Sequence, residues 1–194
     1  MAHPVRNFLI GRRALLAGAP AFFALPALAD VGPLGPDLFK GTVARFDRAR
    51  AGKPLPALPF LDVEDKPMNF ADFKDRILLV NFWATWCAPC VKEMPSLDRL
   101  QAIVGKNKLI VLPLSLDGPS RSKVVPFYQD KGLVNLGIFF DRGRKIMQAA
   151  DVSILPTTIL ADKQGRELGR LEGEADWDKP EAVALIEAAV GGAG

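Results

Sequence analysis

Apolar residues in the middle of the chain follow a strand, helix, strand order. Residues 77–84 are an apolar run rich in β-branched and aromatic side chains, which predicts a buried strand. The apolar residues that follow recur at three- and four-residue spacing: Val91, Met94, Leu97 and Leu100. That spacing predicts an amphipathic helix. Because residues 109–116 form a second apolar run, we expect two parallel strands joined by this helix.

The remaining pattern adds elements on both sides of this unit. Residues 58–63 are expected to form an edge strand, because Pro59 cannot donate a backbone hydrogen bond inside a sheet. The later elements are a helix at 120–131, a strand at 137–140, a helix at 145–152, a hairpin of 157–161 with 167–171, and a helix at 178–190. The pattern therefore predicts an α/β protein with a central mixed sheet flanked by helices and an N-terminal β extension.

The only two cysteines, Cys87 and Cys90, lie where the buried strand gives way to the helix. Ala88 and Pro89 separate them, and proline suits the first turn of a helix, where its missing N–H is not needed. Two thiols at this spacing can close a small disulfide ring. The positive end of the helix dipole favours the thiolate of the first cysteine. The pattern therefore predicts dithiol–disulfide redox chemistry.

Two other uses of a cysteine pair fit less well. A zinc site needs four ligands, but there is no second cysteine pair, and the single histidine, His3, lies close to the N-terminus. A purely structural disulfide between residues this close would constrain the unfolded chain very little. We therefore expect no bound metal and a pair that opens and closes.

Residues 1–29 have the composition of an export segment. They contain Arg6, Arg12 and Arg13 and no acidic residue, and residues 14–29 are uncharged. Ala27-Leu28-Ala29 offers small residues for a signal peptidase. The uncharged stretch is shorter than the roughly 20 residues of a membrane span, so a cleaved signal is favoured over an uncleaved anchor. The paired arginines also resemble a twin-arginine signal, and the export route stays open.

Charge and length limit the rest of the chain. The chain has 25 basic and 22 acidic residues, and three of the arginines lie within residues 1–29, so the remainder is electrically neutral. A neutral chain lacks the basic excess of a nucleic-acid-binding protein. We expect a Pro- and Gly-containing extension at 30–54 and a single domain at 55–192. Outside the cytoplasm, two cysteines in one such motif suit an exchanger.

Residues 81–95 carry a specific resemblance. Their sequence, Asn-Phe-Trp-Ala-Thr-Trp-Cys-Ala-Pro-Cys-Val-Lys-Glu-Met-Pro, resembles the TlpA/ResA/DsbE family of exported thiol–disulfide oxidoreductases, with TlpA as the most similar member. The likeness extends over about residues 55–190 and includes Ala175-Asp176-Trp177. It implies a thioredoxin-like fold, a periplasmic location and no cofactor.

The resemblance also implies roles for individual residues. Cys87 matches the family's nucleophile and Cys90 its resolving thiol. Pro156 matches a proline that the fold holds in cis, which would leave the backbone of Leu155 to pair with a partner strand. From sequence alone, a trans proline starting a strand is an equal alternative. Trp86, Ala88 and Pro89 would complete the partner surface, although packing is the simpler role for Trp86.

Glu93 matches an acid that lies beside the cysteine pair in some family members. A carboxylate there would oppose thiolate formation by charge repulsion and could relay a proton. The simpler alternative is a solvated glutamate on the helix surface. The buried acid of thioredoxin itself corresponds to Asn81, which cannot carry a proton.

The resemblance implies an enzyme that reduces disulfides in client proteins. Family clients include apocytochrome c and the copper-site cysteines of cytochrome oxidase, and a membrane electron donor restores the reduced enzyme. Two alternatives stay open. A DsbA-like oxidant would usually carry a histidine between the cysteines, and a copper metallochaperone would usually recruit a further His or Met ligand.

Overall fold

The computed structural model describes Met1, residues 34–118 and residues 121–192. The predicted export segment at 1–29 therefore lies, apart from Met1, outside the described residues. Among the described helices, none combines the length and apolar character needed to cross a membrane.

Seven strands in the described residues form one mixed sheet in the order β2-β1-β5-β4-β3-β6-β7. Their bounds are β1 Phe60–Asp62, β2 Pro67–Met68, β3 Ile77–Trp83, β4 Leu109–Ser115, β5 Phe139–Phe140, β6 Thr157–Ala161 and β7 Glu167–Glu172. Strand β4 pairs in parallel with β3 and β5, and the other pairs are antiparallel. This arrangement confirms the predicted mixed sheet.

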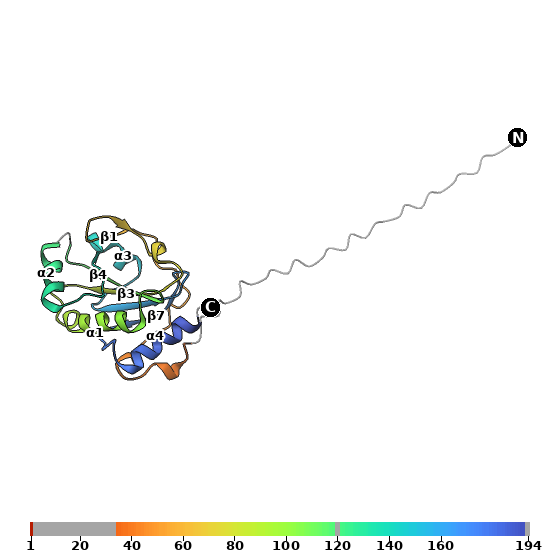
Figure 1. Ribbon diagram of the computed structural model, residues 1–194. Helices are drawn as coiled ribbons and strands as arrows, with labels where there is room; N and C mark the ends of the chain where they lie inside the picture. The colour runs from red at the N-terminus through yellow and green to blue at the C-terminus, as the bar shows by residue number, and fades with distance from the viewer. Residues whose placement is uncertain (2–33, 119–120, 193–194) are drawn as a thin grey trace.

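The helices cover both faces of the sheet. Figure 1 shows α1 (Ala88–Val104) and α4 (Pro180–Gly192) together on one face, with α3 (Lys145–Ala149) on the opposite face. Helix α2 (Arg121–Lys131) contributes to the same apolar core as α1 and α4. The short 3₁₀ helices are η1 Pro36–Leu38, η2 Gly41–Val43, η3 Phe70–Phe73 and η4 Arg142–Arg144.

Strand β3 is the centre of the molecule because every one of its residues is buried. Successive side chains of a strand point to opposite faces, and the two cores follow this rule. Ile77 and Leu79 join the core beneath α1 and α4, whereas Leu78 and Val80 join the core beneath α3. An apolar run with no polar alternation is therefore what a strand with two covered faces requires.

The prediction that residues 58–63 form an edge strand was wrong. Strand β1 begins at Phe60 and lies between β2 and β5, so β2 is the edge strand. Pro59 precedes the paired residues, and its missing N–H therefore interrupts no ladder. The proline that does lie on the edge is Pro67, in β2.

The described part of the N-terminal extension packs against the domain. Leu34, Val43 and Phe46 are buried in the core shared with α1 and α4. Backbone bridges join Asp47 to Arg170 and Pro54 to Arg166, so this segment runs along the outer edge of β7. The extension therefore covers an edge that would otherwise offer unpaired N–H and C=O groups.

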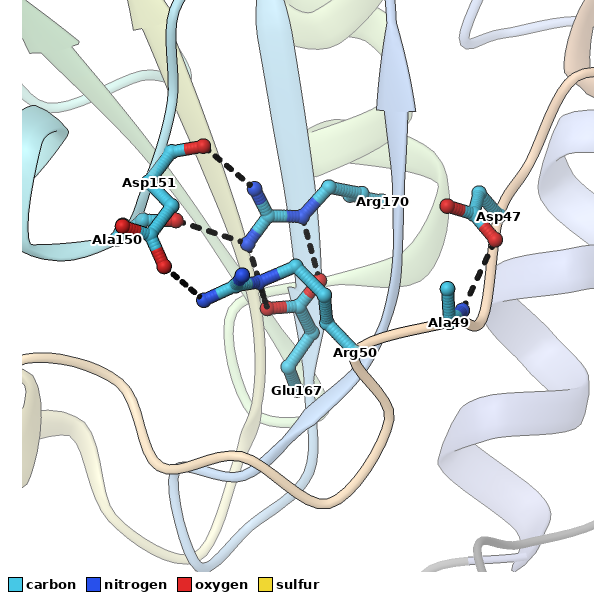
Figure 2. A network of polar contacts seen from close by, with 7 residues as sticks. All are labelled: Asp47, Ala49, Arg50, Ala150, Asp151, Glu167 and Arg170. Carbon is cyan, nitrogen blue, oxygen red and sulfur yellow. Dashed lines mark hydrogen bonds and ion pairs between the residues drawn. The ribbon is translucent and has the colours of Figure 1, made fainter.

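A polar cluster with a buried ion pair at its centre joins the extension to β7 and to the residues after α3 (Figure 2). The Arg170 guanidinium donates to both carboxylate oxygens of Glu167 at 2.7 Å, and both side chains are almost fully buried. Arg170 also donates to the backbone carbonyls of Ala150 and Asp151. Arg50 of the extension donates to the Asp151 carboxylate at 2.7 Å. The extension, β7 and the residues after α3 thus meet at one polar cluster.

Candidate functional site

The cysteine pair lies between the end of β3 and the start of α1. Cys87 is the N-cap residue of α1, and its Sγ accepts a hydrogen bond from the Cys90 backbone N–H at 3.4 Å. The two sulfur atoms form a disulfide bond. Cys87 is 7% exposed and Cys90 is fully buried. Only Cys87 can therefore be approached from solvent, as its predicted role as nucleophile requires.

Asp117 holds the turn that carries the cysteine pair. Its carboxylate accepts the Thr85 backbone N–H at 2.8 Å, and it also bonds the Thr85 and Ser115 hydroxyls. Asp117 follows β4, so a carboxylate on the neighbouring strand fixes the loop before Cys87. Local sequence pattern gives no signal for this contact, because 32 positions separate Asp117 from Thr85.

Glu93 lies one helical turn after Cys90 and is only 1% exposed. Its Oε1 accepts from Asn81 Nδ2 at 2.7 Å, and its Oε2 accepts from the Ala175 backbone N–H at 3.2 Å and from Trp177 Nε1 at 3.3 Å. The solvated surface glutamate considered as the alternative is therefore wrong. Glu93 is a buried acid on the same helix as Cys90, one turn further along.

Two opposing effects set the pKa of Glu93. Burial disfavours the charged form and raises the pKa to about 7, while the three hydrogen-bond donors act in the opposite direction. A cavity of about 70 Å³ adjoins this carboxyl and is lined by Thr42, Lys92, Glu93, Glu174, Ala175 and Asp176. Glu93 can therefore change its protonation state near neutral pH beside a space large enough for water.

Burial of this acid predicts a pH-dependent stability. Between pH 4.5, the ordinary pKa of a glutamate, and about 7, folded Glu93 keeps a proton that the unfolded chain releases. The stabilisation is complete below pH 4.5 and is lost as the pH rises through 7, a change of about 3 kcal/mol. Urea unfolding of the oxidised protein should show this loss, and Glu93→Gln should remove it.

The matched control is Glu187→Gln, which makes the same chemical change at an exposed position of α4. This variant should keep the wild-type pH dependence. No histidine titrates in the window outside the N-terminal segment, since His3 is the only one in the chain. Equal slopes in the wild type and Glu93→Gln would contradict the assignment of a raised pKa.

The loop before β6 contains Leu155 and Pro156, two of the residues predicted to bind a partner. The Leu155–Pro156 peptide bond is cis, as the family resemblance implies. The backbone N–H and C=O of Leu155 have no hydrogen-bond partner within residues 34–118 and 121–192. Ile154 in the same loop is 47% exposed. The loop thus presents both apolar surface and free backbone groups.

Trp86 is 61% exposed, and Ala88 and Pro89 are also exposed. Packing was the simpler role expected for Trp86, and that expectation was wrong: Trp83 is the tryptophan buried in the core. Three exposed uncharged residues therefore lie next to Cys87 in the chain. Among the described residues, no three His, Cys, Asp or Glu side chains gather closely enough to hold a metal ion.

Comparison with known proteins agrees with this site. The AhpC/TSA family matches residues 51–166. The thiol-disulfide oxidoreductase ResA of Bacillus thuringiensis (strain Al Hakam) is 32% identical over 143 residues, which cover 74% of this chain and 82% of the relative.

Two solved structures share the fold. A thiol:disulfide interchange protein described as DsbE, from Chlorobium tepidum, has a TM-score of 0.65 at 23% identity and covers 72% of this chain and 97% of its own. StoA from Bacillus subtilis has a TM-score of 0.56 at 21% identity, covering 70% and 98%. With a redox-active cysteine pair on a thioredoxin-like fold, the chain belongs to the AhpC/TSA family and is a thiol-disulfide oxidoreductase of the ResA/DsbE type.

Proposed function

We propose that the protein is exported and reduces disulfides in client proteins, with Cys87 as the attacking thiol and Cys90 as the resolving thiol. The Cys87 thiolate attacks a client disulfide, forms a mixed disulfide and releases one client thiol. The Cys90 thiolate then attacks Cys87 Sγ and releases the second client thiol. The two electrons leave the dithiol, and the Cys87–Cys90 disulfide remains.

The observation that carries the reducing direction is the charge around the pair. Ala88 and Pro89 give the Cys87 thiolate no positive partner, and the only acid one turn beyond Cys90 is the buried Glu93. A negative carboxylate destabilises a nearby thiolate. A dithiol whose reduced form is poorly stabilised is a reductant, whereas DsbA is a strong oxidant because its reduced form is stabilised.

Glu93 is proposed to accept the proton that Cys90 must lose before it attacks. The carboxyl and the thiol are one helical turn apart, and both are buried. A general base works best when its pKa lies near the working pH, and the pKa of Glu93 is about 7. The cavity beside Glu93 supports later exchange of that proton with water.

The proposed partner surface consists of Trp86, Ala88, Pro89, Leu155 and Pro156. The free backbone N–H and C=O of Leu155 suit an extended client segment that pairs as an added strand. Trp86 would cover the apolar side of that segment. By resemblance, the clients are apocytochrome c or copper-site proteins, and a membrane donor supplies electrons to the disulfide.

The redox potential tests this proposal. Equilibration against glutathione buffers should give a potential at or below about −200 mV, because the pair lacks a positive partner for the thiolate. Glu93→Gln should raise the potential by removing the negative charge. A wild-type potential of about −120 mV would contradict the reductase function and favour a DsbA-like oxidant.

A further inference from the structure

Asn81 lies in β3 and contacts the buried acid Glu93. It is fully buried in β3, directly opposite Thr158 of β6. Its Nδ2 donates to Glu93 Oε1 at 2.7 Å and to Thr158 Oγ1 at 2.9 Å. Its Oδ1 is buried and has no hydrogen-bond partner among the described residues. All polar partners of this amide therefore lie on one side.

The orientation of the amide fits only one charge state of Glu93. An amide nitrogen that donates both hydrogens suits an ionised carboxylate, which only accepts. When Glu93 is protonated, the proton belongs on Oε1, because Oε2 already faces the N–H groups of Ala175 and Trp177. The new O–H group then needs an acceptor where Asn81 presents a donor.

We propose that Asn81 is a positioning residue whose side-chain amide turns over when Glu93 gains or loses its proton. In the turned orientation, Oδ1 occupies the former place of Nδ2 and accepts from the Glu93 O–H and from the Thr158 hydroxyl. An amide is donor at one end and acceptor at the other, so it can serve both states without displacing its neighbours. The inference rests on the proposed function only for the use made of the proton.

This arrangement explains why a neutral amide occupies the place. An aspartate at residue 81 would lie within hydrogen-bond distance of Glu93, and one of the two acids would stay protonated. A leucine of similar size would offer neither a donor nor an acceptor. With asparagine, either orientation leaves one end of the amide unpaired, so neither charge state is strongly preferred.

The charged groups around this carboxyl lie on its solvent side. Lys92 and Glu174 form an ion pair at 2.6 Å, and both line the cavity with Asp176. On the sheet side, Asn81 and Thr158 are uncharged, and the disulfide of Cys87 and Cys90 does not titrate in the oxidised protein. Oxidised protein therefore isolates the titration of Glu93 from that of the thiols.

The test uses nuclear magnetic resonance on the oxidised wild-type protein across a pH series. The Glu93 carboxyl carbon should titrate, and both Asn81 side-chain amide protons should shift with the same midpoint, because both leave their hydrogen-bond partners. In Glu93→Gln the Asn81 resonances should stay constant with pH. Asn81 resonances that do not move through the Glu93 titration would overturn the proposal.

Asn81→Leu supplies a second measurement. A turning amide serves both the carboxylate and the protonated acid, so its removal should change the pKa of Glu93 by less than about one pH unit, whereas loss of a fixed donor would raise the pKa by more. Thr157→Val is the matched control, since the Thr157 hydroxyl is also buried on β6 but bonds the Ile154 carbonyl. A rise of more than about one pH unit in the pKa of Glu93 in folded Asn81→Leu would refute the inference, because it would show that Asn81 only donates. Neither measurement depends on the redox potential. The inference about Asn81 can therefore be refuted while the proposed reductase function still holds.

Discussion

Replacing Cys90 by serine is expected to turn the protein into a covalent trap for its clients. Cys87 can still attack a client disulfide, but serine at residue 90 cannot resolve the mixed disulfide. Cys87 and Cys90 are the only two cysteines of the chain, so no other thiol can take the place of Cys90. Adducts that a reductant dissolves should therefore accumulate, and mass spectrometry should locate each one at Cys87.

The complementary variant defines the roles of the two thiols. Cys87→Ser should form no adducts and should reduce no client disulfide, because the remaining thiol is shielded from solvent. With limiting iodoacetamide, the reduced wild-type protein should be modified first at Cys87, where the helix dipole favours thiolate. Adducts or preferential labelling at Cys90 would reverse the two assignments.

Sequence was sufficient for the cysteine pair because its chemistry is local. The apolar run before Cys87, the helical spacing after it and the proline in the first turn all lie within a short segment. These local preferences agree with the observed strand and helix, and Cys87 occupies the predicted helix start. A motif can be predicted from sequence when its local preferences all agree with the final fold, as they do here.

The surroundings of Glu93 could not be predicted in the same way. Its partners Asn81, Ala175 and Trp177 come from β3 and from the loop before α4, up to 84 positions away. On helix periodicity alone, a glutamate next to Lys92 is typical of a solvated face. Only the packed loop before α4 shows that the carboxyl is enclosed. The family resemblance supplied the signal that spacing lacked.

The order of the strands in the sheet likewise could not be predicted from the local sequence pattern. Pro59 correctly indicated a position without a ladder hydrogen bond, but it lies just before β1 and carries no information on the neighbours of that strand. The sheet edge is set by the pairing of β1 with β2 and β5, which are distant or very short segments. Non-local pairing depends on packing that propensity does not encode.

The buried ion pair of Arg170 with Glu167 in β7 should contribute strongly to stability. Among the described residues, Arg170→Met leaves the buried Glu167 carboxylate with only Arg50 Nε, 3.9 Å away and not hydrogen-bonded to it. It also removes the donor to the Ala150 and Asp151 carbonyls. Breaking a buried pair in this way costs about 3–5 kcal/mol. Urea unfolding should show a loss of this size in Arg170→Met.

Arg166→Met is the matched control for that measurement. Arg166 also forms an ion pair next to β7, with Asp162, but its side chain is 41% exposed. Exposed pairs are worth about 1 kcal/mol or less, so this variant should unfold close to the wild type. The double variant Arg170→Met, Glu167→Leu should recover part of the loss, because no unpaired charge stays buried.

The polar cluster lies close in sequence to the loop that contains Leu155 and Pro156, so Arg170→Met also tests client reduction. Ala150 and Asp151 end α3, and the chain reaches the cis bond at Pro156 only a few residues later. If the cluster also sets the place of Leu155, Arg170→Met should weaken client reduction under conditions where the variant is still folded. Full activity in folded Arg170→Met would restrict the ion pair to a role in stability and leave the partner loop to be held by β6 and β7 alone.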